Sequence, residues 1–294
     1  MANSVAPSRL RAWKNQNQTM KTQIQSTRRI QRAISSALLA AGLLANARSA
    51  PGQTVYSAQF ESPFVAGQPL AGQDGWTAPG IFNPLAAIVS TDQPRQGKQS
   101  VQVRGADLEH SDLVNELTEG YYDTVGSYRR AVNFETGGAV RARVSAHVRI
   151  DGPATSGVNF FSAALSVRAA VLDADGNVVD TAGAGQIDLS SDGYAHANDG
   201  NHNVPIFLSS VPAALGTWHE LAIVTDFDSG TFTLSVDGQS LGTYPVPEDI
   251  NSTILARGAL LTFAAPDSAD MNKAAYSASF DKFEVKAVGR TEGF

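Results

Sequence analysis

The sequence predicts an all-β chain: a two-sheet antiparallel β-sandwich that follows an N-terminal signal segment. Two observations carry this prediction. From Val55 onward the apolar residues recur with a period of two, and the alternating runs are short and separated by Gly- and Asp-containing turns. Long helical periodicity is absent after residue 50. Many short strands with frequent tight turns favour a sandwich over a parallel sheet with crossover helices.

The first 50 residues have the pattern of an export signal. They hold eight basic and no acidic side chains, and they continue into the apolar run 33–45 and small residues at 45–50. The run is too short for a membrane span, which needs about 20 apolar residues. We therefore expect residues 1–50 to be a removed signal peptide, with Met20 as a second candidate start. Two alternatives stay open: twin-arginine export, and an amphipathic helix that belongs to the fold.

The charge of the chain divides at the same place. The whole chain has 22 Lys+Arg and 28 Asp+Glu, a formal charge of −6; without residues 1–50, 14 basic and 28 acidic residues remain, a charge of −14. Nucleic acid is an unexpected partner for so acidic a domain, because phosphate binding requires a basic surface. The absence of Cys excludes disulfides, thiolate metal sites and a cysteine nucleophile.

Residues 51–294 are expected to form one domain, without a membrane anchor and outside the cytoplasm, either secreted or periplasmic. Its clearest strand is 140–150, where Val and Ala alternate with Arg, Ser and His. The segment 161–171 repeats the pattern, and Asp175-Gly176 predicts a hairpin after it. Residues 107–119 are predicted to form one short helix or a loop.

Three motifs resemble a known family. Trp218-His219-Glu220-Leu221 is followed by the acidic turn 226–230 and by a strand that ends in Val236-Asp237-Gly238. Together with segments 60–76 and 276–285, this order resembles the laminin-G-like domains of the concanavalin A-like lectin/glucanase superfamily. The resemblance implies a jelly roll whose first and last strands lie side by side. That fold hosts lectins, adhesion modules, glycosidases and polysaccharide lyases, so it does not define a function.

Catalysis has one candidate surface. Arg141, Arg143 and His147 project from one face of the strand 140–150, where they suit the carboxylate of a uronic acid. The resemblance to lyases of this fold is incomplete, because Gln186-Ile187-Asp188 has Asp where those enzymes have His. The alternative is a solvated face paired with acidic neighbours across the sheet, which the sequence favours. A glycosidase is disfavoured, because no strand carries two suitably spaced glutamates.

Carbohydrate binding requires aromatic rings and polar side chains close together. Six residues are candidates for ligand contact: Tyr121, Tyr122, Tyr128, Arg129, Tyr194 and His196. The last two lie in the segment 190–203, which we expect to be a polar surface loop. Trp76 and Trp218 are expected to pack in the core.

Calcium is the expected cofactor, in a structural role, because hard oxygen ligands are abundant in an acidic secreted sandwich. Glu61 and Asp281 are its candidate ligands, since the resemblance places them near neighbouring terminal strands. The segment 173–177 has Gly in the wrong place for an EF-hand loop and is read as a hairpin turn.

The predicted function is a secreted, non-catalytic module that binds a glycan or another extracellular surface component. The alternatives are a divergent polysaccharide lyase that acts on an acidic glycan, and a purely structural extracellular module.

Overall fold

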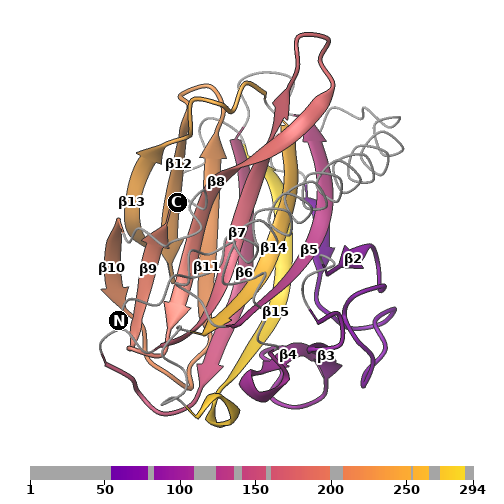
Figure 1. The fold of residues 1–294 in the computed structure, drawn as a ribbon, viewed down its shortest axis with the longest axis vertical. Helices are drawn as coiled ribbons and strands as arrows, with labels where there is room; N and C mark the ends of the chain where they lie inside the picture. The colour runs from indigo at the N-terminus through magenta and orange to yellow at the C-terminus, as the bar shows by residue number, and fades with distance from the viewer. Residues whose placement is uncertain are drawn as a thin grey trace, which may run out of the picture.

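Two antiparallel sheets face each other in the computed structural model (Figure 1), which confirms the predicted sandwich. The structure describes residues 54–78, 83–108, 124–135, 141–156, 160–198, 208–252, 254–264 and 272–288. The predicted signal segment therefore lies outside the described residues, as do Tyr121 and Tyr122.

The first sheet, sheet A, has the strand order β13-β12-β11-β6-β15-β4-β3, with β1 also paired to β15. Its strands are β1 (Thr54–Ala58), β3 (Ala87–Ser90), β4 (Ser100–Arg104), β6 (Arg141–Asp151), β11 (His219–Asp226), β12 (Thr231–Val236), β13 (Gln239–Pro245) and β15 (Ser277–Val288). The pairing of β1 with β15 confirms that the first and last strands lie side by side.

The second sheet, sheet B, has the order β10-β9-β8-β7-β14-β5-β2. Its strands are β2 (Trp76–Thr77), β5 (Thr124–Glu135), β7 (Phe161–Leu172), β8 (Val178–Ser190), β9 (Tyr194–Asn198), β10 (Ser209–Pro212) and β14 (Ile254–Ala264). Two short 3-10 turns, η1 (Gly105–Asp107) and η2 (Lys273–Ala275), complete the described elements. Most of the segment 107–119 lies outside the described residues.

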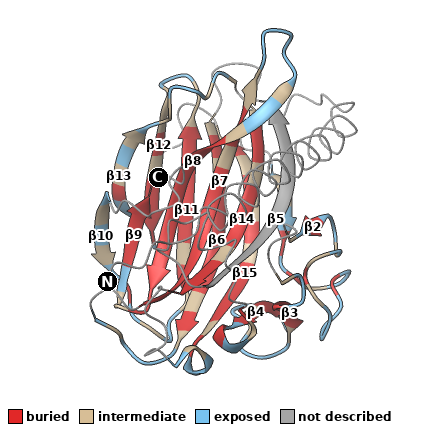
Figure 2. Cartoon of the chain, in the orientation of Figure 1, coloured by how far each residue is buried: buried red, intermediate tan, exposed pale blue. Residues whose placement is uncertain are grey.

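The period of two decides which side chains enter the core. On β6, Ala142, Val144, Ala146, Val148 and Ile150 are all buried in the hydrophobic core, as the alternation predicts. The predicted hairpin joins β7 to β8, where Gly176 has a φ of 82° and the Asp173 carboxylate accepts the backbone N–H of Asp175 and Asn177. The central strands are mostly buried, whereas the edge strands β10 and β13 are more exposed (Figure 2).

The sheets meet around Phe283 of β15. Its ring packs edge-on against Trp76, with centroids 5.1 Å apart, and both side chains are fully buried. Gly258 of β14 faces the same ring, and a Cβ at this position would lie 2.4 Å from Phe283 Cζ. Only glycine lets β14 approach β15 this closely. Trp76 is therefore a core residue as predicted, but Trp218 is only half-buried, because it lies before the start of β11.

The family-like motifs on β11 and β12 are joined by hydrogen bonds. His219 Nδ1 lies 2.7 Å from Asp237 Oδ2, and the other oxygen of that carboxylate accepts the Glu220 N–H at 2.8 Å. Asp237 has a φ of 50° in the turn to β13. The histidine of the Trp-His motif therefore helps to fix the turn formed by the Val-Asp-Gly motif.

We predict that Phe283→Ala lowers the free energy of unfolding by about 3–5 kcal/mol, because it leaves a cavity between the sheets. Urea denaturation followed by tryptophan fluorescence measures the change. Leu85→Ala, at a side chain that is 63% exposed, is the control and changes stability by less than about 0.5 kcal/mol. Equal effects of the two substitutions would contradict this description of the core.

Candidate functional site

The outer face of sheet B carries a row of buried polar side chains. Ile187 and Leu189 of β8 point into the core, so Gln186 and Asp188 lie on the opposite face. On β9, Ala195 and Ala197 enter the core, so that His196 and Asn198 lie on the outer face. We call Gln186, Asp188, His196 and Asn198 the polar row.

The strand register brings these four residues together. Asp188 lies opposite His196, and Gln186 lies opposite Asn198. Gln186 Nε2 donates to Asp188 Oδ1 at 2.7 Å, and Asn198 Nδ2 lies 3.4 Å from Asp188 Oδ2. The carboxylate of Asp188 is therefore held at the centre of the row by two side-chain amides.

The Asp188 carboxyl is the most perturbed group in the row. Its side chain is buried, and this burial raises its pKa to about 6, against the opposing effects of the Gln186 and Asn198 hydrogen bonds and the charge of His196. Carboxyl groups with pKa values shifted by burial are found at functional sites, so Asp188 is a candidate functional group of this face.

His196 has a second acidic neighbour. Its Nε2 lies 2.9 Å from Asp192 Oδ2, in the turn between β8 and β9. Burial would raise the pKa of Asp192, but the hydrogen bond and charge of His196 outweigh this, so the pKa is lowered. The imidazole of His196 therefore lies close to two carboxyl groups whose pKa values are shifted in opposite directions: that of Asp188 is raised and that of Asp192 is lowered.

An exposed rim borders the row at the sheet edge. Tyr194 of β9 is 44% exposed, and its ring centroid is 6.2 Å from that of His196. Pro212 and Ser210 of β10 lie opposite Tyr194 and His196, and both are exposed, as is Leu208. Tyr194 and His196, both predicted from sequence, are thus neighbours on one face.

The prediction of a polar loop over 190–203 is wrong at 194–198, because Ala195 and Ala197 fill the core and make this segment a strand.

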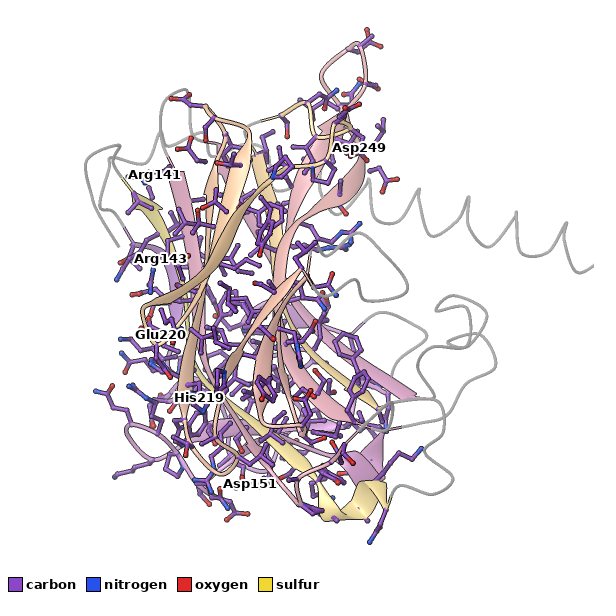
Figure 3. The ribbon with its side chains drawn as sticks, turned by 90° about the vertical axis from the view of Figure 1, so that its left-hand side faces the viewer. Arg141, Arg143, Asp151, His219, Glu220 and Asp249 are labelled. Atoms are coloured by element: carbon purple, nitrogen blue, oxygen red, sulfur yellow. The ribbon has the colours of Figure 1, made fainter. Side chains whose placement is uncertain are left out.

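The predicted basic stripe lies on the other sheet. Arg141, Arg143 and His147 point outward from β6 in sheet A, and Figure 3 shows the two arginines and Glu220 along one side of the molecule. Arg143 Nη2 is 2.8 Å from Glu220 Oε1 on β11. Burial and the nearby Arg95 lower the pKa of His147 to about 4. The stripe therefore does not meet Tyr194 and His196, and its central arginine is paired across the sheet.

Of the remaining candidates, Tyr128 and Arg129 lie on β5, where they stand opposite Leu260 and Ala259 of β14. The structure describes only the backbone of this strand. Tyr121 and Tyr122 lie outside the described residues, so their predicted ligand contact stays a prediction.

The two carboxylates predicted to hold calcium bind backbone amides instead. Glu61 Oε1 accepts the N–H groups of Lys98 and Gln99 at 2.5 and 2.9 Å. Asp281 Oδ2 accepts those of Arg95 and Gln96, both at 3.1 Å. Pairs of successive N–H groups attract anions and repel a cation. Glu61 and Asp281 as placed here therefore do not fit a shared calcium site; they fix the loop between β3 and β4.

Other metal positions are also lacking in the described ranges, where no group of three or more His, Cys, Asp or Glu is placed to hold a metal ion. Within the same part of the chain, we find no helix of the length and hydropathy needed to cross a membrane.

Sequence reasoning missed the centre of the row. Gln186 and Asp188 were noted only as a departure from a lyase motif, and their alternation with Ile187 and Leu189 was the available signal. The opposition of Asp188 to His196 depends on register, which the sequence alone does not fix.

In fold class, the described residues form a concanavalin A-like β-sandwich. A laminin-G-type family model, described as the concanavalin A-like lectin/glucanases superfamily, matches residues 142–286. This match confirms the resemblance that the motifs on β11 and β12 predicted. Comparison with curated protein sequences finds no match.

Solved structures share the fold at low sequence identity. An endo-1,3-beta-glucanase from Streptomyces sioyaensis has a TM-score of 0.51 and 14% identity, over 83% of this chain and 99% of that one. Lectin II from Ulex europaeus has a TM-score of 0.46 and 10% identity, over 81% and 100%. A sialidase gives 0.43 and 12%, over 82% of this chain but 19% of its own, so this chain spans about a fifth of that length. The glucanase comparison shows the fold, and no activity is transferred from it.

We predict that Asp188→Asn raises the melting temperature at pH 7 and leaves it nearly unchanged at pH 4. The folded-state pKa of about 6 exceeds the ordinary 3.8, so the free energy of unfolding falls as pH rises between these values. Removal of the buried charge returns about 3 kcal/mol at neutral pH, the free energy that corresponds to a pKa raised from 3.8 to about 6. Asp192→Asn is the matched control, and it lowers stability at pH 7 because the Asp192 pKa is lowered. A destabilised Asp188→Asn at pH 7 would contradict this.

We also predict that Ca²⁺ and EDTA each shift the melting temperature by less than about 1 °C, since the proposed ligands hold backbone amides. Differential scanning fluorimetry measures this directly. A rise of several degrees in the melting temperature on addition of Ca²⁺ would instead support the structural calcium ion that the sequence predicts.

Proposed function

We propose that this chain is a secreted, non-catalytic carbohydrate-binding protein that takes its glycan on the outer face of sheet B, across strands β8 and β9. The observation that carries the proposal is the polar row, which is built around the buried Asp188 and bordered by the exposed Tyr194.

The chemistry of the row suits sugar hydroxyls. Each hydroxyl both donates and accepts, so a site for it needs fixed acceptors beside fixed donors. Asp188 supplies acceptor oxygens, and the Gln186 and Asn198 amides supply donors and acceptors from neighbouring positions on two strands. Because these groups already bond one another, they are held in place before a ligand arrives.

The rim suits the apolar face of a sugar ring. Tyr194 presents an exposed aromatic ring beside His196, and Pro212 lies opposite it on β10. Aromatic rings combine a large apolar surface with a polar edge, so they are common where a ligand has one face of each kind. Small-ligand sites combine aromatic and apolar surface with a few placed polar groups, and Tyr194 and the polar row supply one of each kind.

Export and partners belong to the same proposal. The acid-free residues 1–50 support secretion, and the −14 charge of the rest supports an extracellular glycan or surface component over nucleic acid as partner.

We predict that Tyr194→Ala weakens glycan binding at least about tenfold, because it removes the stacking surface. A glycan array identifies the ligand, and isothermal titration calorimetry with the best glycan measures the affinity. Leu85→Ala, at an exposed apolar side chain near β3, is the matched control and leaves the affinity unchanged.

The outcomes separate the three predicted functions. Glycan binding that is lost in Tyr194→Ala supports the proposal. An ultraviolet assay that detects unsaturated sugar products would instead support a lyase. Silence in both experiments would leave a structural module and would overturn the proposal.

A further inference from the structure

One carboxylate in the turn between β8 and β9 reaches both the rim and the polar row. Asp192 Oδ1 accepts the backbone N–H of Tyr194 at 3.0 Å. Asp192 Oδ2 lies 2.9 Å from His196 Nε2. The same side chain therefore links the backbone that carries the exposed aromatic ring to the histidine of the polar row.

The turn that carries Asp192 is itself anchored to the core. Gly193 has a φ of 87°, and its N–H donates to the Ser190 carbonyl oxygen at 3.1 Å, which closes the turn. The Gly193 carbonyl oxygen accepts the N–H of Ala213 at 2.8 Å, and Ala213 is buried in the hydrophobic core. Asp192 therefore presents its carboxylate from a backbone whose position the core determines.

The carboxylate also determines which ring nitrogen of His196 carries a proton. Burial would raise the pKa of Asp192, but the hydrogen bond and the charge of His196 outweigh this, so the pKa is lowered and the group is ionised at neutral pH. An ionised carboxylate only accepts hydrogen bonds, so His196 Nε2 must be the donor of the 2.9 Å contact. In the neutral imidazole, the proton therefore lies on Nε2 and not on Nδ1.

The rim needs such a constraint, because packing holds its aromatic side chain only in part. Tyr194 is 44% exposed, and its ring centroid is 6.2 Å from that of His196. A side chain that becomes ordered only when a ligand binds loses conformational entropy, which weakens the affinity. Fixing the Tyr194 backbone and the His196 ring in advance reduces this loss.

We propose that Asp192 is a positioning residue of the glycan site, whose two oxygens hold the Tyr194 backbone and the Nε2-protonated form of His196 in the arrangement that binds the sugar. This inference rests on the proposed glycan-binding function and adds how the rim and the polar row are kept in one arrangement. Asp192 acts through Tyr194 and His196, without contact to the glycan.

A first experiment measures the position of the proton without a ligand. Nitrogen-15 NMR of the full-length chain distinguishes a protonated from an unprotonated ring nitrogen, and we expect neutral His196 to be protonated on Nε2. In Asp192→Asn, Oδ1 still accepts the Tyr194 N–H, so the amide nitrogen faces His196 and donates to Nε2. The histidine proton is therefore found on Nδ1. A variant that is less stable but keeps the proton on Nε2 would overturn the proposal.

A second experiment is calorimetric titration of the full-length chain with the oligosaccharide that the glycan array selects, well below the melting temperature of each variant. Asp192→Ala weakens the affinity roughly 5- to 100-fold, because the ligand must then order two side chains. Asp192→Asn loses less, because it keeps the contact with the Tyr194 N–H. Equal affinity of Asp192→Ala and the parent chain would overturn the proposal.

Asp173→Ala is the matched control. Asp173 Oδ1 also accepts two backbone N–H groups in a turn, those of Asp175 and Asn177, but at the opposite end of β8. Its removal leaves both the glycan affinity and the protonated nitrogen of His196 unchanged. A loss of affinity in Asp173→Ala equal to that in Asp192→Ala would show a general effect of turn stability and would overturn the positioning role.

The remaining outcomes distinguish this inference from the function on which it rests. Glycan binding that is lost in Tyr194→Ala but kept in Asp192→Ala overturns the positioning role and keeps the proposed function. Absence of binding to every glycan on the array overturns both proposals.

Discussion

The close contact between the inner faces of the two sheets determines where everything else in this molecule lies. Phe283 fills the space between β15 and β14, and Gly258 is the position that allows the approach. Because side chains alternate along each strand, an apolar inner face leaves polar groups only on the outer faces and the ends. The ionisable side chains of the central strands therefore lie on the outer faces of the two sheets or at the ends of strands.

Sheet A carries charges that satisfy one another. Arg143 pairs with Glu220, and Lys286 Nζ lies 2.7 Å from Glu284 Oε2, as expected for a structural surface. Sheet B carries the polar row, in which the Asp188 carboxyl is buried and its pKa is raised to about 6. Buried titratable groups occur in both sheets, since burial also lowers the pKa of His147 on sheet A to about 4. Sheet B differs because its polar row is bordered by the exposed ring of Tyr194.

The sequence pattern predicted those strands and turns whose signals lie within a few neighbouring residues. The alternation over 140–150 identified β6, and Asp175-Gly176 identified the β7–β8 hairpin, because both signals are complete within a few residues. The strand β9 was missed, since Ala195 and Ala197 are weakly apolar and stand among turn-forming residues. The site itself depends on which strands are neighbours and in what register, and that information is not local.

In the proposed site, Asp188 is the carboxylate that contacts the ligand from a preorganised face. Carbon-13 NMR of the Asp188 carboxyl, titrated with and without a bound glycan, tests it most directly. We expect a pKa near 6 in the free protein. That pKa falls when glycan is bound, because sugar hydroxyls donate to the ionised form. A pKa that is the same in the free and the glycan-bound protein would show that the glycan does not contact Asp188.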